Sequence, residues 1–288
     1  MDLRVLEYFV TVAEEGNITR AAELLHVSQP TVSRQLMDLE AEVGKTLLVR
    51  SKRNVSLTKE GMLFRETARE MLTLYEKAVQ ENTEEGQLSG DVVLGAGETA
   101  SFSWLAGRMG AFQEEYPGVK FHVISENADR IIEDIEKGLL DLGFVHRQVS
   151  PVRFESLELP LREQWGVLLP ADHPLAGKDR LAPGDLRGER LILPENALFQ
   201  RELKQWLGAG AERRMMGSCN LIYNAIAMTQ EGMGLAVCFG REEYTGGLRF
   251  VPFEGMKDAP SMLIWKKRPI QPAAVERFLA FVSDAVSE

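Results

Sequence analysis

Two adjacent alanines in a short helix, followed by a tight turn, restrict what the first part of this chain can form. Ala21-Ala22 lie on the apolar face of a helix predicted over residues 18–25, where small side chains let a second helix cross closely. His26-Val27 leaves room only for a very short turn, and Ser28 is a favoured N-cap for a third helix. Pro30 is tolerated in the first turn of that helix, because the amide that proline lacks would have no helical partner there.

The third predicted helix presents polar side chains at its N-terminal end. Val32, Leu36 and Leu39 face inward at helical spacing. The outward positions hold Gln29, Thr31, Ser33 and Arg34. Short donors and acceptors with one guanidinium suit the base edges and phosphates of a major groove. The pattern therefore favours a helix-turn-helix that binds double-stranded operator DNA over a plain three-helix bundle.

A basic run follows the third helix, between residues 45 and 59, where no acidic residue occurs. A solvated basic loop would look similar, but Leu47-Leu48 and the strand-like Val55-Ser56-Leu57 favour a β-hairpin wing with a basic tip near the phosphates. The net charge of −10 argues against DNA binding through bulk electrostatics, so affinity must come from this local patch. The candidate DNA-contacting residues are Ser28, Gln29, Pro30, Thr31, Ser33, Arg34, Arg50, Lys52 and Arg53.

This segment resembles the DNA-binding domain of LysR-type transcriptional regulators. The matching stretch, residues 17–36, reads NITRAAELLHVSQPTVSRQL. It is followed by Leu39-Glu40, Gly44, Leu47, Arg50 and Leu57-Thr58-Lys59-Glu60-Gly61, with Leu48 where the family usually has Phe. The resemblance implies a sequence-specific transcriptional regulator, and not an enzyme, whose activity a small-molecule effector controls.

A long helix is predicted after the hairpin. Phe64, Ala68, Met71, Tyr75 and Ala78 recur at steps of four and three, as in a heptad seam. A helix from residue 58 to about 88 would be about 45 Å long, too long to bury against so small a domain. A partner helix from a second chain is therefore favoured, and the resemblance also implies a homodimer or homotetramer.

The remaining residues alternate between strand and helix patterns. The expected fold class is a multidomain α+β chain with a winged helix-turn-helix, a long linker helix and a two-lobed α/β domain like type 2 periplasmic binding proteins, as the resemblance implies. We assign residues 1–58 to the DNA-binding domain, 59–89 to the dimerising linker helix and 90–288 to the effector-binding domain. Lobe I comprises about 90–161 and 267–288, because the last amphipathic helix is expected to return to it, and lobe II about 162–266.

Polar residues at the predicted strand ends are the candidates for an effector site, because the resemblance places the ligand between the lobes. They are Thr99, Ala100, Ser101, Phe102, Asn127, His146, Arg147, Asn196, Phe199 and Asn220. A helix N-terminus and a cationic His146-Arg147 pair favour a negative group, so we expect a small, polar, anionic metabolite with Thr99 and Ser101 at its acid end. In the alternatives, Asn127 and Asn220 only cap helices, His146 and Arg147 are solvated hinge residues, and Phe199 is ordinary core.

Two other kinds of sensor remain open. Residues 95–100, reading GAGETA, resemble a dinucleotide fingerprint, with Glu126 placed to bind a ribose, so a Rossmann-like sensor is a rival hypothesis. Cys219 and Cys238 would serve a thiol redox sensor, although buried structural thiols are favoured.

The motif inventory does not suggest an enzyme. The four histidines have no metal-ligand spacing, and neither a G-x-S-x-G elbow nor a P-loop occurs, so we expect no catalytic residue, metal or cofactor. Met1-Asp2-Leu3-Arg4 leads directly into helical periodicity, and no apolar stretch is long enough to span a bilayer, so a cytoplasmic protein without a membrane partner is expected. RNA polymerase is a further candidate partner.

Overall fold

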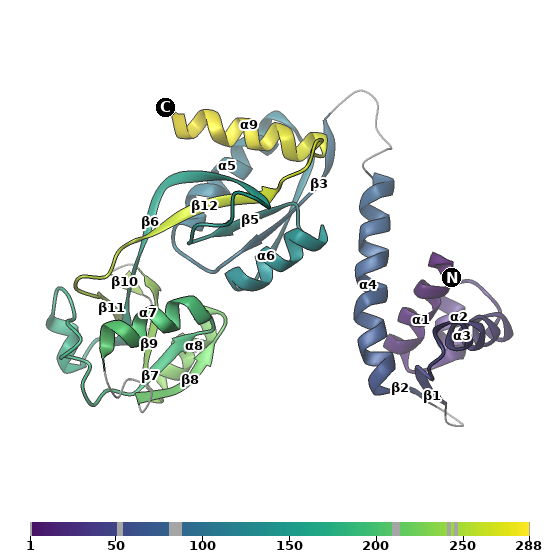
Figure 1. Ribbon diagram of the computed structural model, residues 1–288, viewed down its shortest axis with the longest axis horizontal. Coiled ribbons are helices and arrows are strands. Elements are labelled where there is room, and N and C mark those ends of the chain that lie inside the picture. Colours follow the sequence, from purple (N-terminus) through teal and green to yellow (C-terminus); the bar gives the residue numbers. More distant parts are fainter. Residues whose placement is uncertain are drawn as a thin grey trace. The chain divides into compact units, whose positions relative to one another are not determined.

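The computed structural model describes residues 2–50, 54–80, 88–208, 214–240, 243–244 and 247–287. The chain divides into two compact units, Met1–Thr83 and Glu84–Glu288, which are described in turn (Figure 1). None of the described helices is long and apolar enough to cross a membrane.

Three capped helices build the core of the N-terminal unit. They are α1 (Leu3–Glu15), α2 (Ile18–Leu24) and α3 (Gln29–Val43), whose first turns donate amide hydrogens to the side chains of Asp2, Asn17 and Ser28. Ala21 and Ala22 are buried against the other helices, as predicted. His26 takes a positive φ of 54° in the turn between α2 and α3, which is the conformation that this tight connection requires.

The predicted hairpin is confirmed. Strand β1 (Leu48–Arg50) pairs antiparallel with β2 (Val55–Leu57). Residues 51–53, which include the predicted wing-tip cations Lys52 and Arg53, lie outside the described residues. The hairpin sits close to the next helix at Gly61, where an added Cβ would lie 2.0 Å from the carbonyl oxygen of Leu47.

Helix α4 (Lys59–Gln80) carries two apolar surfaces rather than one seam. Phe64 and Ala68 pack into the core of their own unit, with the Phe64 ring 5.3 Å from that of Phe9. Met71 and Tyr75, further along the predicted seam, are exposed. The apolar positions are therefore divided, because the first turns of α4 close the core of their own unit, and the partner helix stays a prediction for the exposed part.

The first half of the C-terminal unit is a sheet covered by helices (Figure 1). Strands β3 (Ser89–Ala96), β4 (Gly118–Ser125) and β5 (Leu142–Val145) pair in parallel in the order β4-β3-β5, with α5 (Phe102–Glu115) and α6 (Ala128–Lys137) between them in sequence. The last helix, α9 (Ala273–Ser287), packs Val275 and Phe278 into the same core as Val92 and Leu94. Its predicted return to the first lobe is confirmed.

The second half of this unit has its own core and its own helices. Its strands are β7 (Leu191–Pro194), β8 (Met215–Cys219), β9 (Leu235–Gly240), β10 (Glu243–Tyr244) and β11 (Leu248–Pro252). Its helices are the short 3₁₀ helix η1 (Pro174–Gly177), α7 (Ala197–Leu207) and α8 (Ile222–Gln230).

Two long strands connect the halves. Strand β6 (Phe154–Pro170) pairs along its first part with β12 (Ala259–Lys266), and along its last part with β9 and β11. Only residues 166–169 of β6 are predicted as a strand from the sequence. Polar and charged residues interrupt the earlier part of β6, so the sequence pattern does not predict a strand there.

Candidate DNA-binding face and effector cavity

The N-terminal end of α3 is open to solvent. Gln29, Pro30 and Arg34 are exposed, and Thr31 is exposed beside Ser28, with 2.7 Å between their hydroxyl oxygens. The Oγ of Ser28 also accepts the Thr31 amide at 3.3 Å. These contacts fix the first turn of the helix and leave the side chains of Gln29 and Arg34 facing outward, as a base-reading helix requires.

Arg50 is held by the protein itself. Its guanidinium donates to Glu40 Oε2 at 3.1 Å and lies 3.4 Å from the Ser33 hydroxyl. The other carboxylate oxygen of Glu40 accepts the amides of Leu47 and Leu48 at 2.8 and 2.9 Å. Glu40 therefore joins the hairpin to α3. Glu40 belongs to the family pattern, but its role is not predictable from the sequence because its partners follow it by seven or more residues.

A cavity of about 430 Å³ opens between the two halves of the C-terminal unit. Seven of the ten predicted effector residues line it, namely Thr99, Asn127, His146, Arg147, Asn196, Phe199 and Asn220. Six of them follow the carboxyl ends of β3, β4, β5, β7 and β8, so the predicted convergence of strand ends is present, and Phe199 lies in the first turn of α7. A cavity of this size suits a small metabolite.

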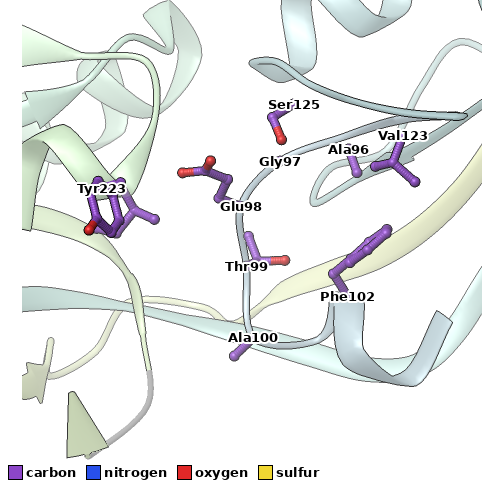
Figure 2. Close-up of a pocket in the computed structure, with 10 residues that line it drawn as sticks. Ala96, Gly97, Glu98, Thr99, Ala100, Phe102, Val123, Ser125 and Tyr223 are labelled. Carbon is purple, nitrogen blue, oxygen red and sulfur yellow. The ribbon is translucent and has the colours of Figure 1, made fainter. Parts of the chain in front are cut away.

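A neighbouring cavity of about 420 Å³ shares the loop after β3 with the main cavity (Figure 2). The predicted residues Ala100 and Phe102 line this second cavity, together with Val123 from the first half and Tyr223 from the second. Figure 2 shows the side chains of Glu98 and Thr99 leaving the loop in different directions, with Glu98 directed toward Tyr223. Both residues border both cavities.

Ser101 lines neither cavity and already binds a carboxylate. Its amide and hydroxyl donate to Oε1 of Glu163 at 2.8 and 2.5 Å, and both residues are buried. Glu163 thus occupies the positive N-terminal end of α5, where an effector's acid group is expected from the sequence. The chain supplies this carboxylate itself, and the expected contact between Ser101 and an effector remains a prediction.

His146 is a neutral side chain in this site. Burial lowers its pKa to about 4, so its imidazole carries no charge at neutral pH. Its Nε2 lies 2.9 Å from the Thr99 hydroxyl and its Nδ1 lies 3.2 Å from the Ser261 hydroxyl. The neighbouring Arg147 forms an ion pair with Asp129 at 2.8 Å. Of the two expected cations, only Arg147 is therefore charged, and its guanidinium already has an acidic partner.

Aromatic rings form one wall of the main cavity. The ring of Trp165 stacks on Phe199, with centroids 3.3 Å apart and planes 14° apart, and its other neighbour is Phe239 at 3.7 Å. Phe199 is buried, so it is both a core residue and a lining residue. Such a wall can take the flat or apolar part of a ligand.

The three asparagines have different local roles. Asn127 Oδ1 accepts the Arg130 amide and Asn196 Oδ1 accepts the Phe199 amide, each at 3.0 Å, so both cap helices while lining the cavity. Asn220 does not cap α8, whose N-cap position is Leu221. The capping alternative is therefore wrong for Asn220.

The rival sensors gain no support from the geometry. Glu163 occupies the helix end where a pyrophosphate would bind, and Gly95 is required for packing, since a Cβ there would lie 2.6 Å from Leu140. Burial raises the pKa of Cys238 to about 12, and it also raises that of Cys219, so neither thiol is activated. No group of ligating side chains that could hold a metal occurs among the described residues.

Comparisons with known proteins agree with this architecture. The family described as "Bacterial regulatory helix-turn-helix protein, lysR family" matches residues 3–62, and "LysR substrate binding domain" matches residues 85–287. The Hca operon transcriptional activator HcaR of Escherichia coli (strain K12) is 32% identical over 296 residues, covering 100% of this chain and 99% of that protein. A probable cat1 operon transcriptional activator of Acinetobacter lwoffii is 37% identical over 196 residues, covering 67% of this chain and 64% of that protein.

Solved structures show the same fold. CbnR, a LysR family transcriptional regulator, superposes with a TM-score of 0.77 at 24% identity, covering 100% of both chains. Full-length CbnR complexed with target DNA superposes with a TM-score of 0.75 at 25% identity, covering 99% of this chain and 100% of that one. The helix-turn-helix, the two-part α/β unit and these matches identify the chain as a member of the LysR family of transcriptional regulators, with a DNA-binding and an effector-binding domain.

Proposed function

We propose that the main cavity binds a small polar metabolite and that its occupancy controls operator binding by the N-terminal unit. The observation that carries this proposal is the lining of one cavity by strand ends from both halves of the effector-binding domain. A ligand there contacts both halves at once, so it stabilises one arrangement of them over others. The acid group expected from the sequence would then lie near Arg147 or Lys257, because Ser101 and His146 are engaged elsewhere.

The exposed end of α3 is proposed to read the operator. Gln29, Thr31 and Arg34 would contact base edges in the major groove, with Ser28, Pro30 and Ser33 beside them. Lys52 and Arg53 would contact phosphate, while Arg50 would fix the hairpin against α3 through Glu40. The fold shared with the CbnR–DNA complex supports this placement.

The assembly proposed for this regulator is at least a homodimer through α4. Met71, Leu74, Tyr75 and Val79 are exposed apolar side chains in the second part of this helix. From the family we also propose that the protein can form a homotetramer and that RNA polymerase is a partner. Since the protein acts on DNA, its proposed location is the bacterial cytoplasm.

A thermal-shift screen of metabolites on the full chain tests the effector site. A ligand that binds only the folded state raises the melting temperature in proportion to the logarithm of its concentration over Kd. Asn220→Ala, in the cavity, should reduce that rise, whereas Ser103→Ala, on the exposed face of α5, should not. A ligand that protects Asn220→Ala as well as the unaltered protein would place the site elsewhere.

The link to DNA needs a separate measurement. The stabilising ligand should change the affinity of the full chain for its operator in a fluorescence anisotropy titration, and Asn220→Ala should weaken that change. An operator affinity that is the same with and without saturating ligand would contradict the proposed control.

A further inference from the structure

Four side chains link a buried carboxylate to the main cavity through hydrogen bonds. Ser101 Oγ donates its single hydrogen to Glu163 Oε1, so its oxygen can only accept from its other neighbours. Those neighbours are the hydroxyls of Ser261, at 3.5 Å, and Thr99, at 3.4 Å. His146 closes the ring of contacts, with Nε2 at 2.9 Å from Thr99 and Nδ1 at 3.2 Å from Ser261.

Two arrangements of the hydrogens use every donor in this network and give both nitrogens of His146 a partner. In the first, His146 donates through Nδ1 to Ser261, Ser261 donates to Ser101, and Thr99 donates to His146 Nε2. In the second, His146 donates through Nε2 to Thr99, Thr99 donates to Ser101, and Ser261 donates to His146 Nδ1. Because the imidazole is neutral, it carries one N–H in either case.

The hydroxyl hydrogen of Thr99 is therefore used inside the protein in both arrangements. What Thr99 Oγ1 offers to the cavity is a lone pair, which accepts a hydrogen bond. A ligand carboxylate at this oxygen would break one internal bond, whereas an N–H or O–H group would add a bond without breaking any.

We propose that the effector places a hydrogen-bond donor, an ammonium group, against Thr99. This inference rests on the proposed effector cavity and names the chemistry of one end of its ligand. A carboxylate at the other end, near Arg147 or Lys257, is compatible with it, so an amino acid or an ω-amino acid has the matching arrangement of groups.

The charges around the cavity favour the same ligand end. Five acidic residues line the cavity against the two cations Arg147 and Lys257, and the acids are Glu98, Glu126, Glu195, Glu202 and Asp258. Glu163 adds a buried acid behind Thr99, two hydrogen bonds away. An ammonium group at Thr99 is attracted by these carboxylates, while a second carboxylate there would be repelled.

Three probes that differ only at one end test the inference on the full chain by calorimetry. The three probes share a carboxylate and a spacer of three methylene groups. The other end is an ammonium group in γ-aminobutyrate, a second carboxylate in glutarate and a methyl group in pentanoate. γ-Aminobutyrate should bind about tenfold more tightly than pentanoate, as one charge-assisted hydrogen bond provides, and glutarate should bind most weakly.

Variants at position 99 show whether Thr99 causes the preference for the ammonium probe. Thr99→Val should reduce the preference for γ-aminobutyrate over pentanoate to the part that the surrounding carboxylates provide, and Thr99→Ser, which keeps the hydroxyl, should retain it in full. Melting temperature and ligand-free operator binding serve as controls for folding. A merely structural role of Thr99 would weaken all three probes alike and leave their ratio unchanged.

The possible failures are distinguishable. Glutarate binding at least as tightly as γ-aminobutyrate, or a probe ratio that Thr99→Val leaves unchanged, overturns the donor at Thr99 and leaves the effector cavity in place. If none of the three probes binds at millimolar concentration, the donor inference is wrong, while the effector cavity is decided separately by the thermal-shift screen with Asn220→Ala.

Discussion

Arg34 and Lys52 both carry positive charge in the DNA-binding domain, but they are expected to act on DNA in different ways. Arg34 is exposed on the recognition helix α3, so Arg34→Ala should weaken specific operator binding by about 1–3 kcal/mol. Lys52 precedes Arg53 at the predicted wing tip, so Lys52→Ala should weaken all DNA sequences alike and lower the slope of affinity against salt. Anisotropy titrations at two salt concentrations measure both effects. Unchanged operator affinity in both variants would contradict the assigned DNA-contacting residues.

His146 is expected to make the stability of the effector-binding domain depend on pH. Its pKa is about 4 in the folded protein against 6.5 for an ordinary histidine, because burial disfavours the charged form. Between these pH values the unfolded chain binds more protons, so stability is full above about pH 6.5 and falls by at most about 3 kcal/mol as the pH drops to about 4. Urea unfolding at neutral and mildly acidic pH should show this loss.

The matched control for that effect is His146→Gln, which keeps polar groups near Thr99 and Ser261 but does not titrate in this range. The variant should show a flatter dependence of the free energy of unfolding on pH. Equal pH dependence in the two proteins would assign the effect to other groups.

Which site residues are predictable follows from where their partners lie in the chain. Thr99, Asn127 and His146 each follow a strand within three residues. Because the carboxyl ends of parallel strands meet at one edge of a sheet, the sequence reveals their convergence. Glu163 lies 62 residues from Ser101 and within a strand that looks polar. Its place at the end of α5 depends on the crossover of β6, which no local pattern encodes.

Helix α4 shows how a regular apolar pattern can serve two purposes. The spacing of Phe64, Ala68, Met71 and Tyr75 predicts one continuous seam, yet the first two residues pack within their own unit and the last two are exposed. A heptad pattern specifies which side chains share a face, but not whether the cover comes from the same chain or from another. The helix itself is therefore predictable from the sequence. Which of its apolar side chains pack within their own unit and which are exposed is not.

The exposed part of that face supports a prediction about assembly. Tyr75→Glu places a charge among Met71, Leu74 and Val79, so burying this surface in a dimer would require desolvating a carboxylate. Light scattering at micromolar concentration should show at least a dimer for the unaltered protein and a smaller species for the variant. Glu76→Gln, at an exposed neighbouring position, is the matched control and should assemble normally. Identical masses for the unaltered protein and Tyr75→Glu would rule out α4 as the interface.

Two compact units in one chain imply two unfolding events. Met1–Thr83 and Glu84–Glu288 each bury their own core, so calorimetry of the full chain should resolve two transitions. A ligand of the effector cavity should raise only the transition that belongs to the C-terminal unit. If a chain truncated after residue 83 lacks the ligand-sensitive transition, that transition belongs to the C-terminal unit. A single transition that the ligand shifts as a whole would show instead that the units unfold together.

The paired strands β6 and β12 connect the two halves of the effector-binding domain, so a movement of one half against the other would have to deform them. A loop hinge swings freely, but a hydrogen-bonded ribbon resists bending in its own plane and yields most readily to torsion. The ladder is irregular between Pro260 and Met262, and Pro260 contributes no amide hydrogen, so rotation should concentrate at that point. Glu163, paired in register with Ala259 beside it, attaches the end of α5 to this pivot. A ligand that rotates one half against the other would thus twist the paired strands β6 and β12 within one or two residues of the site where the ligand binds.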